Sequence, residues 1–204
     1  RRAIVVTDAV FSMDGDLAPL NELAEVCTRN GALLVVDEAH SVISPAVEYG
    51  EAEVLRVGTL SKTLGALGGF VAGPRAAVDL IVNRSRAYIF TTAPTPADMA
   101  AALAALKIVR SQEGDALREI LRSRVRQLQP EIKSPASPII PIRFGTEQAT
   151  LGAAAALLEQ GFLVPAIRPP TVPVGTSRLR IALSATHSAE QVDALARALI
   201  ALRS

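Results

Sequence analysis

The 204-residue chain has one cysteine, two histidines and only three lysines. Its single cysteine, Cys27, excludes an intrachain disulfide and any zinc site built from cysteines, and it fits a reducing compartment. We therefore expect a cytoplasmic protein in which Cys27 is a buried small side chain on a helix. Because lysine and histidine are rare here, those that follow strand-like runs are candidates for site residues.

An excess of charge and a long apolar run are also absent. The chain has 21 basic and 20 acidic residues without a long block of like charge, so nothing favours nucleic acid or an anionic membrane as a partner. Lys107 and Arg110 interrupt the alanine-rich run after Pro96, so we expect no membrane span. Residues 1–8 run into a β-branched strand and do not resemble a signal peptide. The sequence thus begins as if in mid-domain, which suggests a fragment or a protein that has lost its front half.

The first part of the chain has the pattern of an α/β domain. Short continuous runs of β-branched residues are typical of strands covered on both faces in a parallel sheet. Between the first two runs, Leu20, Ala24 and Cys27 have helical spacing, with Pro19 before them and Gly31 after them. We expect strands at residues 3–6, 32–36, 54–57, 70–72 and 88–90, and further helices at residues 74–84 and 96–110.

The second part has a different texture. A charged helical pattern at residues 115–129 leads to strands at residues 139–144, 162–164 and 179–183, which alternate with helices at residues 147–160 and 189–202. This order predicts a smaller α+β domain. We therefore expect part of a large domain with a mostly parallel sheet at residues 1–110, followed by a C-terminal domain at residues 111–204.

Two segments carry the candidate chemistry. One predicted strand ends in Val36-Asp37-Glu-Ala-His40, and the next is followed by Lys62 in a turn that contains several glycines. Neighbouring strands would place these residues at the sheet edge where open α/β sheets bind ligands. Pyridoxal phosphate needs a lysine for a Schiff base and a carboxylate for its pyridine nitrogen, which Lys62 and Asp37 supply. His40 suits the ring oxygen, Thr59 and the glycine turn suit the phosphate, and no metal is required.

Two other interpretations of these segments need weighing. An apolar strand that ends in Asp-Glu-Ala-His is also typical of an ATP-dependent helicase, and Ser184-Ala-Thr186 imitates a second helicase motif. A helicase, however, needs a G-x-x-x-x-G-K-[ST] loop before that strand, whereas Arg56 and Ser61 occupy the glycine positions before Lys62. The purely structural interpretation is a buried strand that ends in aspartate, followed by an ordinary surface turn that contains the lysine.

Three motifs in a fixed order resemble the α-oxoamine synthases, which are fold-type I pyridoxal phosphate enzymes. These motifs are Phe11-Ser12-Met-Asp-Gly-Asp16, Val36-Asp37-Glu-Ala-His40 and Thr59-Leu-Ser-Lys62. The resemblance runs through the whole chain, while the N-terminal part of the family has no counterpart in it. Arg168-Pro-Pro-Thr171 most resembles members that join L-alanine to a pimeloyl thioester of coenzyme A or acyl carrier protein in biotin biosynthesis. Glycine C-acetyltransferase and 5-aminolevulinate synthase types are the alternatives within the family.

The resemblance implies roles for residues near the cofactor. Lys62 would form the Schiff base with pyridoxal 5'-phosphate, Asp37 would pair with the pyridine nitrogen, and His40 would contact the ring oxygen. Ser12 and Thr59 would be further cofactor contacts. The bland alternative for Ser12 is that it only shapes a turn.

The resemblance also implies residues for the substrate and for a partner subunit. Arg168 would hold the amino-acid carboxylate, with Thr171 close by. Thr91 and Thr92 would reach the phosphate of the neighbouring subunit's cofactor, which implies a homodimer with shared active sites. A structural cap or a surface ion pair is the alternative role for Arg168. A catalytically silent remnant or partner subunit is the alternative for the chain, although the retained Lys62 argues against it.

Overall fold

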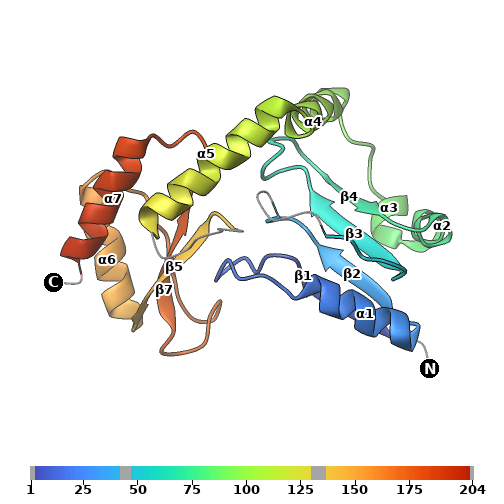
Figure 1. Ribbon diagram of the computed structural model, residues 1–204, viewed down its shortest axis with the longest axis horizontal. Coiled ribbons are helices and arrows are strands. Elements are labelled where there is room, and N and C mark those ends of the chain that lie inside the picture. Colours follow the sequence, from blue (N-terminus) through green and yellow to red (C-terminus); the bar gives the residue numbers. More distant parts are fainter. Residues whose placement is uncertain (1–2, 42–46, 130–136, 203–204) are drawn as a thin grey trace. The chain divides into compact units, whose positions relative to one another are not determined.

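The computed structural model describes residues 3–41, 47–129 and 137–202 (Figure 1). The chain forms two compact units, the first of Arg1–Phe11 with Leu17–Asp115 and the second of Ser12–Asp16 with Ala116–Ser204. The short segment Ser12–Asp16 thus belongs with the second unit. The predicted boundary at residue 110, which concerns the domains of the whole protein, stays a prediction.

The first unit is built on a four-stranded sheet. Its strand order is β1-β2-β3-β4, in which the first three strands are parallel and β4 is antiparallel to β3. The strands are β1 (Ile4–Asp8), β2 (Leu33–Asp37), β3 (Val54–Thr59) and β4 (Gly69–Ala72). The helices are α1 (Leu20–Asn30), α2 (Arg75–Arg84), α3 (Arg86–Ile89) and α4 (Pro96–Val109), while α5 (Gln112–Leu128) begins here and continues into the second unit.

Helix α1 covers one face of this sheet, as Figure 1 shows. Leu20, Ala24 and Cys27 recur on one helical face and are buried against Leu34 and Val36 of β2. The helix ends where the next residue adopts a left-handed conformation, which suits the glycine found there. The predicted βαβ unit and the burial of its cysteine are confirmed.

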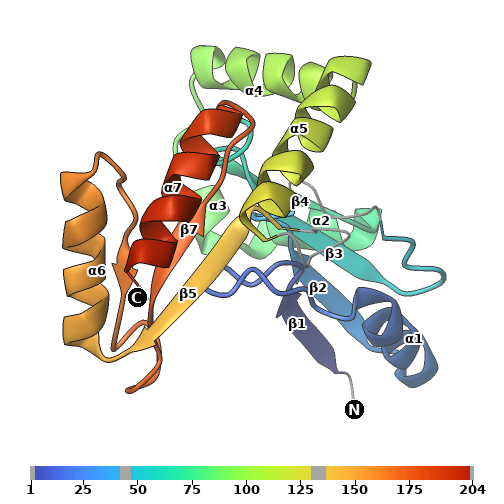
Figure 2. The ribbon, with the colours of Figure 1, turned by 60° about the vertical axis from the view of Figure 1, so that its left-hand side comes forward.

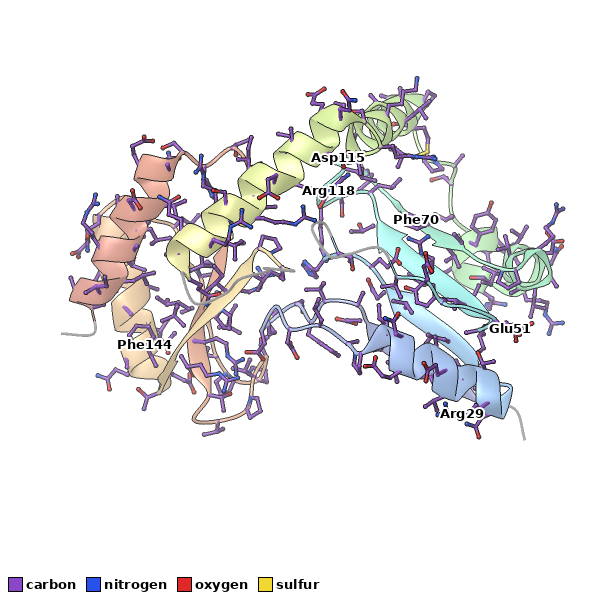
Figure 3. The ribbon with its side chains drawn as sticks, viewed as in Figure 1. Arg29, Glu51, Phe70, Asp115, Arg118 and Phe144 are labelled. Carbon is purple, nitrogen blue, oxygen red and sulfur yellow. The ribbon has the colours of Figure 1, made fainter. Side chains whose placement is uncertain are left out.

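The opposite face of β1 differs from the expectation of strands covered on both faces. Ile4 and Val6 are 65% and 72% exposed, because among the residues placed by the structure no element covers that face. Further along the sheet, Gly58 of β3 lies directly opposite Phe70 of β4, which Figure 3 labels. A Cβ at Gly58 would meet the Phe70 ring. Glycine at this position therefore allows the aromatic ring to pack over β3 next to Thr59.

The second unit has a three-stranded antiparallel sheet of order β5-β7-β6. Its elements are β5 (Ile139–Gly145), α6 (Glu147–Glu159), β6 (Ala166–Ile167), β7 (Ser177–Ala182) and α7 (Ala189–Ala201). Figures 1 and 2 show α6 and α7 along one face of this sheet. Leu179 and Ile181 are buried in β7, whereas Arg178 and Arg180 alternate with them and therefore lie on the opposite face.

Two predicted strands are wrong. Residues 88 and 89 lie within α3 and residue 90 caps its end, while no strand among the described residues pairs with this aromatic segment. Residues 162–164 form no strand, because the amide of Phe162 donates to the Leu157 carbonyl and so closes the end of α6. The strand of that region is β6, which begins only after Pro165.

Candidate active site

Asp37 is the last residue of β2, and His40 lies on the turn that follows. The main-chain carbonyl of Asp37 accepts a hydrogen bond of 2.8 Å from the amide of Ala9, which continues the pairing with the first strand. Its side-chain Oδ1 accepts one of 2.8 Å from the amide of Ala39. An aspartate that bonds the amide two residues on fixes a tight turn. The carboxylate is thereby oriented at the carboxyl end of a buried strand.

Glu38 attaches this turn to the neighbouring strand. Its carboxylate accepts two hydrogen bonds of 2.8 Å from Nε and Nη2 of Arg56 in β3, and a third of 3.4 Å from the Tyr49 hydroxyl. Its amide also donates to the Val57 carbonyl. Burial, and then the negative charge of Glu38, raise the pKa of Tyr49. The sequence did not predict the pairing of Glu38 with Arg56, because Glu38 was considered only as a member of the Asp-Glu-Ala-His motif.

Lys62 lies on the exposed loop between β3 and β4. The amide of Leu60 donates to the Gly68 carbonyl at 2.9 Å, and the Thr59 hydroxyl donates to the same carbonyl at 3.2 Å. The loop is therefore closed at its base, and Gly68 has a φ of 116°, which favours glycine. At its tip, Lys62 Nζ lies 2.9 Å from Nε2 of His40. The structure thus brings the candidate lysine to the histidine that follows the candidate aspartate.

Three predicted site residues lie in the second unit. The main-chain carbonyl of Ser12 accepts a hydrogen bond of 2.5 Å from Nε of Arg180. Arg168 Nε lies 3.8 Å from Oε2 of Glu147, and both side chains are about half exposed. The amide of Thr171 donates to the Arg168 carbonyl at 3.0 Å, beyond a cis peptide bond between two prolines. Arg168 therefore makes the surface ion pair that was its alternative role.

Thr91 and Thr92 are exposed in the segment between α3 and α4, which belongs to the first unit. Asp37, His40 and Lys62 also belong to that unit. The cofactor, substrate and subunit roles predicted for all these residues remain predictions.

Arg180 is a candidate that sequence reasoning missed. Burial lowers the pKa of its guanidinium, and within residues 3–41, 47–129 and 137–202 no ion pair involves it. A partly desolvated cation whose hydrogen bond goes to a neutral carbonyl is suited to an anionic ligand. The signal in the sequence was the alternation of arginines with apolar residues along the last strand.

The side chains of the first unit fit pyridoxal phosphate in their chemistry. Lys62 supplies an amine, Asp37 a carboxylate, and His40 a nitrogen within hydrogen-bond distance of that amine. A metal is a different case: over the placed residues, no three or more histidine, cysteine, aspartate and glutamate side chains are grouped to hold one. Nor does that part of the chain contain a helix long and apolar enough to cross a membrane.

Comparison with curated proteins finds closely similar relatives. The chain is 51% identical over 217 residues to 8-amino-7-oxononanoate synthase of Anaeromyxobacter dehalogenans, with 99% of this chain and 54% of that protein covered. It is 46% identical over 202 residues to the protein of the same name from Methylorubrum populi, with 99% and 52% covered. The chain therefore spans about half the length of these relatives.

Solved structures share the fold. Serine palmitoyltransferase from S. paucimobilis, with a bound PLP–myriocin aldimine, superimposes with a TM-score of 0.89 at 29% identity, covering 98% of this chain and 55% of that one. An 8-amino-7-oxononanoate synthase from Francisella tularensis gives a TM-score of 0.79 at 25% identity, covering 98% and 62%. The predicted α/β fold of fold-type I is confirmed.

A family model decides between the interpretations that the sequence left open. The model described as aminotransferase class I and II matches residues 1–199, nearly the whole chain. This match excludes the helicase interpretation of the Asp-Glu-Ala-His motif. The chain belongs to the class I and II aminotransferase family.

Proposed function

We propose that the protein containing this chain is a pyridoxal 5'-phosphate-dependent 8-amino-7-oxononanoate synthase of biotin biosynthesis. It would condense L-alanine with a pimeloyl thioester and release carbon dioxide and the thiol carrier. The observation that carries this proposal is the 2.9 Å approach of Lys62 Nζ to His40 Nε2 beside the strand-end Asp37. The relatives of 46% and 51% identity support the choice of reaction.

The cofactor contacts would come from the sheet edge. Bound pyridoxal phosphate supplies a ring that stores the electron pair released at the α-carbon of the amino acid. Asp37 would pair with the pyridine nitrogen, and its orienting bond from the Ala39 amide suits that fixed role. His40 would contact the ring oxygen. Thr59 would contact the phosphate, together with Ser12 from the second unit.

Lys62 would anchor the cofactor and move the proton. Once the amino acid has taken its place on the cofactor, the freed Lys62 amine would accept the α-proton and later return one to the product. Its 2.9 Å contact with His40 restrains the amine on an otherwise exposed loop. A restrained base loses less entropy on reaching its reactive position.

Arginines of the second unit would bind the substrate carboxylate. Arg168 retains this proposed role with Thr171 beside it, since its 3.8 Å contact with Glu147 is long and half exposed, and so weak enough to be replaced. Arg180 is a second candidate because its partly buried charge lacks a carboxylate partner over the residues placed. A bidentate guanidinium contact would orient the α-carbon.

The proposal extends to assembly and location. Thr91 and Thr92 would reach the phosphate of a neighbouring subunit's cofactor, so the whole protein would be a homodimer with shared sites. Their exposure between α3 and α4 leaves them accessible to such a contact. The lone cysteine supports a cytoplasmic location.

Replacement of the anchor lysine tests the function. Lys62→Ala in the whole protein should abolish both turnover of L-alanine with the pimeloyl thioester and the visible absorbance of the lysine-bound cofactor, because no amine remains to form the bond. Lys107→Ala, on the exposed face of α4, is the matched control and should retain both. Absorbance spectra and product formation are the measurements. A Lys62→Ala protein with normal spectrum and turnover would refute the proposal, and so would a wild type that takes up no cofactor.

A further inference from the structure

The turn Ser12–Asp16 is held by a buried ion pair. The Arg178 side chain is only 3% exposed, and its Nη1 donates to Oδ1 of Asp14. Its Nε donates to the Thr176 carbonyl at 2.9 Å. A buried guanidinium needs both a counter-charge and hydrogen-bond acceptors, and Asp14 supplies the charge.

A second arginine lies near the same carboxylate. Arg143 of β5 lies directly opposite Arg178 of β7 in the sheet register. Like charges placed opposite one another across two strands repel. Asp14 Oδ1 also lies 3.4 Å from Nη2 of Arg143, so one carboxylate faces both cations. Arg143 is 66% exposed, so solvent screens its charge, whereas the buried Arg178 depends on this carboxylate.

The backbone of the turn also lies close against the sheet. Gly15 has a φ of 71°, and a Cβ at that position would meet the main-chain oxygen of Ile139. Arg180 Nε donates to the Ser12 carbonyl at 2.5 Å. An ion pair, a close backbone approach and a hydrogen bond from an arginine side chain to a main-chain carbonyl thus attach residues 12–16 to β5 and β7.

We propose that Asp14 and Arg178 are positioning residues, which set the location of Ser12 on the frame of β7. This inference rests on the proposed function, in which Ser12 contacts the cofactor. Strand β7 pairs with β6 as well, where Ile167 lies opposite Arg178. Arg168 follows Ile167 directly. Strand β7 therefore holds Ser12 through Arg180 and also positions β6, which leads into Arg168.

Hydrogen exchange tests the attachment without any cofactor. In the Asp14→Asn variant, the amides of residues 12–16 should exchange faster than in the wild type, because the buried arginine loses its counter-charge and the turn detaches more often. Arg143→Ala is the matched control: it removes a 66% exposed arginine from the same carboxylate and should leave that exchange unchanged. Equal exchange of these amides in Asp14→Asn and wild type would overturn the attachment.

Cofactor titration tests the positioning role. The dissociation constant for pyridoxal phosphate, followed by absorbance in the whole protein, should rise roughly tenfold in Asp14→Asn. The reason is that Ser12, once displaced from β7, contacts the cofactor less well. It should stay at the wild-type value in Arg143→Ala. Faster exchange with an unchanged dissociation constant would make the pair merely structural. If the wild type itself binds no cofactor, the proposed function fails, while the exchange measurement still decides the attachment.

A conservative variant covers the case in which Asp14→Asn does not fold. Arg178→Lys keeps a buried positive charge beside Asp14 but lacks the Nε that donates to the Thr176 carbonyl. Circular dichroism should show a folded protein, and exchange at residues 12–16 should lie above the wild-type rate. A folded Arg178→Lys variant with wild-type exchange and wild-type cofactor affinity would overturn the proposal.

Discussion

Glu38 of the first unit and Asp14 of the second are each paired with an arginine, but the two pairs differ in burial. The Glu38 side chain is 16% exposed and its partner Arg56 is 53% exposed, so solvent screens this pair. In the other pair, Asp14 is 34% exposed and Arg178 only 3%. Removal of the carboxylate therefore destabilises the protein more at Asp14 than at Glu38, because it leaves the buried charge of Arg178 without a counter-charge.

Tyr49 gives a pH dependence that belongs to a single residue. Burial raises its pKa above the ordinary value of 10.0, so folded protein holds the phenol proton more tightly than unfolded protein does. The stability that this proton contributes is complete below pH 10.0 and is lost as the pH rises through the folded pKa. The stability advantage of wild type over Tyr49→Phe should therefore shrink above that pH.

Urea unfolding of both proteins between neutral pH and about pH 11 measures this difference, since the ordinary tyrosine pKa is about 10. Groups common to both proteins cancel in the comparison. A difference that stays constant or grows with pH would show that Tyr49 is not buried as the structure has it.

At the scale of elements, the start of α7 is fixed by a capping box. The Ser188 hydroxyl accepts a hydrogen bond of 3.2 Å from the main-chain amide of Gln191. The side-chain Oε1 of Gln191 in turn accepts one of 2.8 Å from the main-chain amide of Ser188. Ser188→Ala should lower the free energy of unfolding by about 1 kcal/mol, because it leaves a helix amide without its acceptor. Ser85 also precedes a helix but makes no such bond, so Ser85→Ala should change little.

Denaturant unfolding followed by circular dichroism compares these two serine variants. The larger loss in Ser188→Ala is the expected result. Equal losses in the two variants would mean that the capping bond contributes nothing measurable to α7.

Elements with strong local signals were predictable from the sequence. The helix at Leu20–Asn30 combines apolar spacing with a proline before it and a glycine after it, and it was placed correctly. The segment at residues 88–90 has the aromatic and β-branched residues of a strand but is helical. Strand propensity decides little when no partner strand is in reach. The end of α6 was misjudged because a helix cap uses the amide that a strand would have used.

At the scale of the whole molecule, the sequence predicted that Lys62 and His40 lie at the same sheet edge, but not their direct contact. Both residues come just after neighbouring parallel strands, so the sequence places them at one sheet edge. The contact between Asp14 and Arg178 was not predictable, because the two residues are 164 positions apart and no local pattern pairs them. For Arg180 the sequence offered only the alternation of arginines with apolar residues along β7, which does not single out one arginine.

The chain spans about half the length of its curated relatives. Among the described residues, no element covers the outward face of β1. Ile4 and Val6 expose apolar surface there, at 65% and 72%. A strand of a doubly covered sheet buries both faces. The activity proposed above is that of the whole protein, to which this chain would contribute Lys62 and the arginines of the second unit.

Reduction with borohydride after incubation with pyridoxal phosphate tests the central claim most directly. Borohydride converts a Schiff base into a stable secondary amine, and peptide mass spectrometry then identifies the lysine that carried it. We predict that the adduct lies on Lys62 and is absent from Lys107. An adduct distributed equally over the lysines, or none on Lys62, would contradict the assignment of Lys62 as the cofactor anchor.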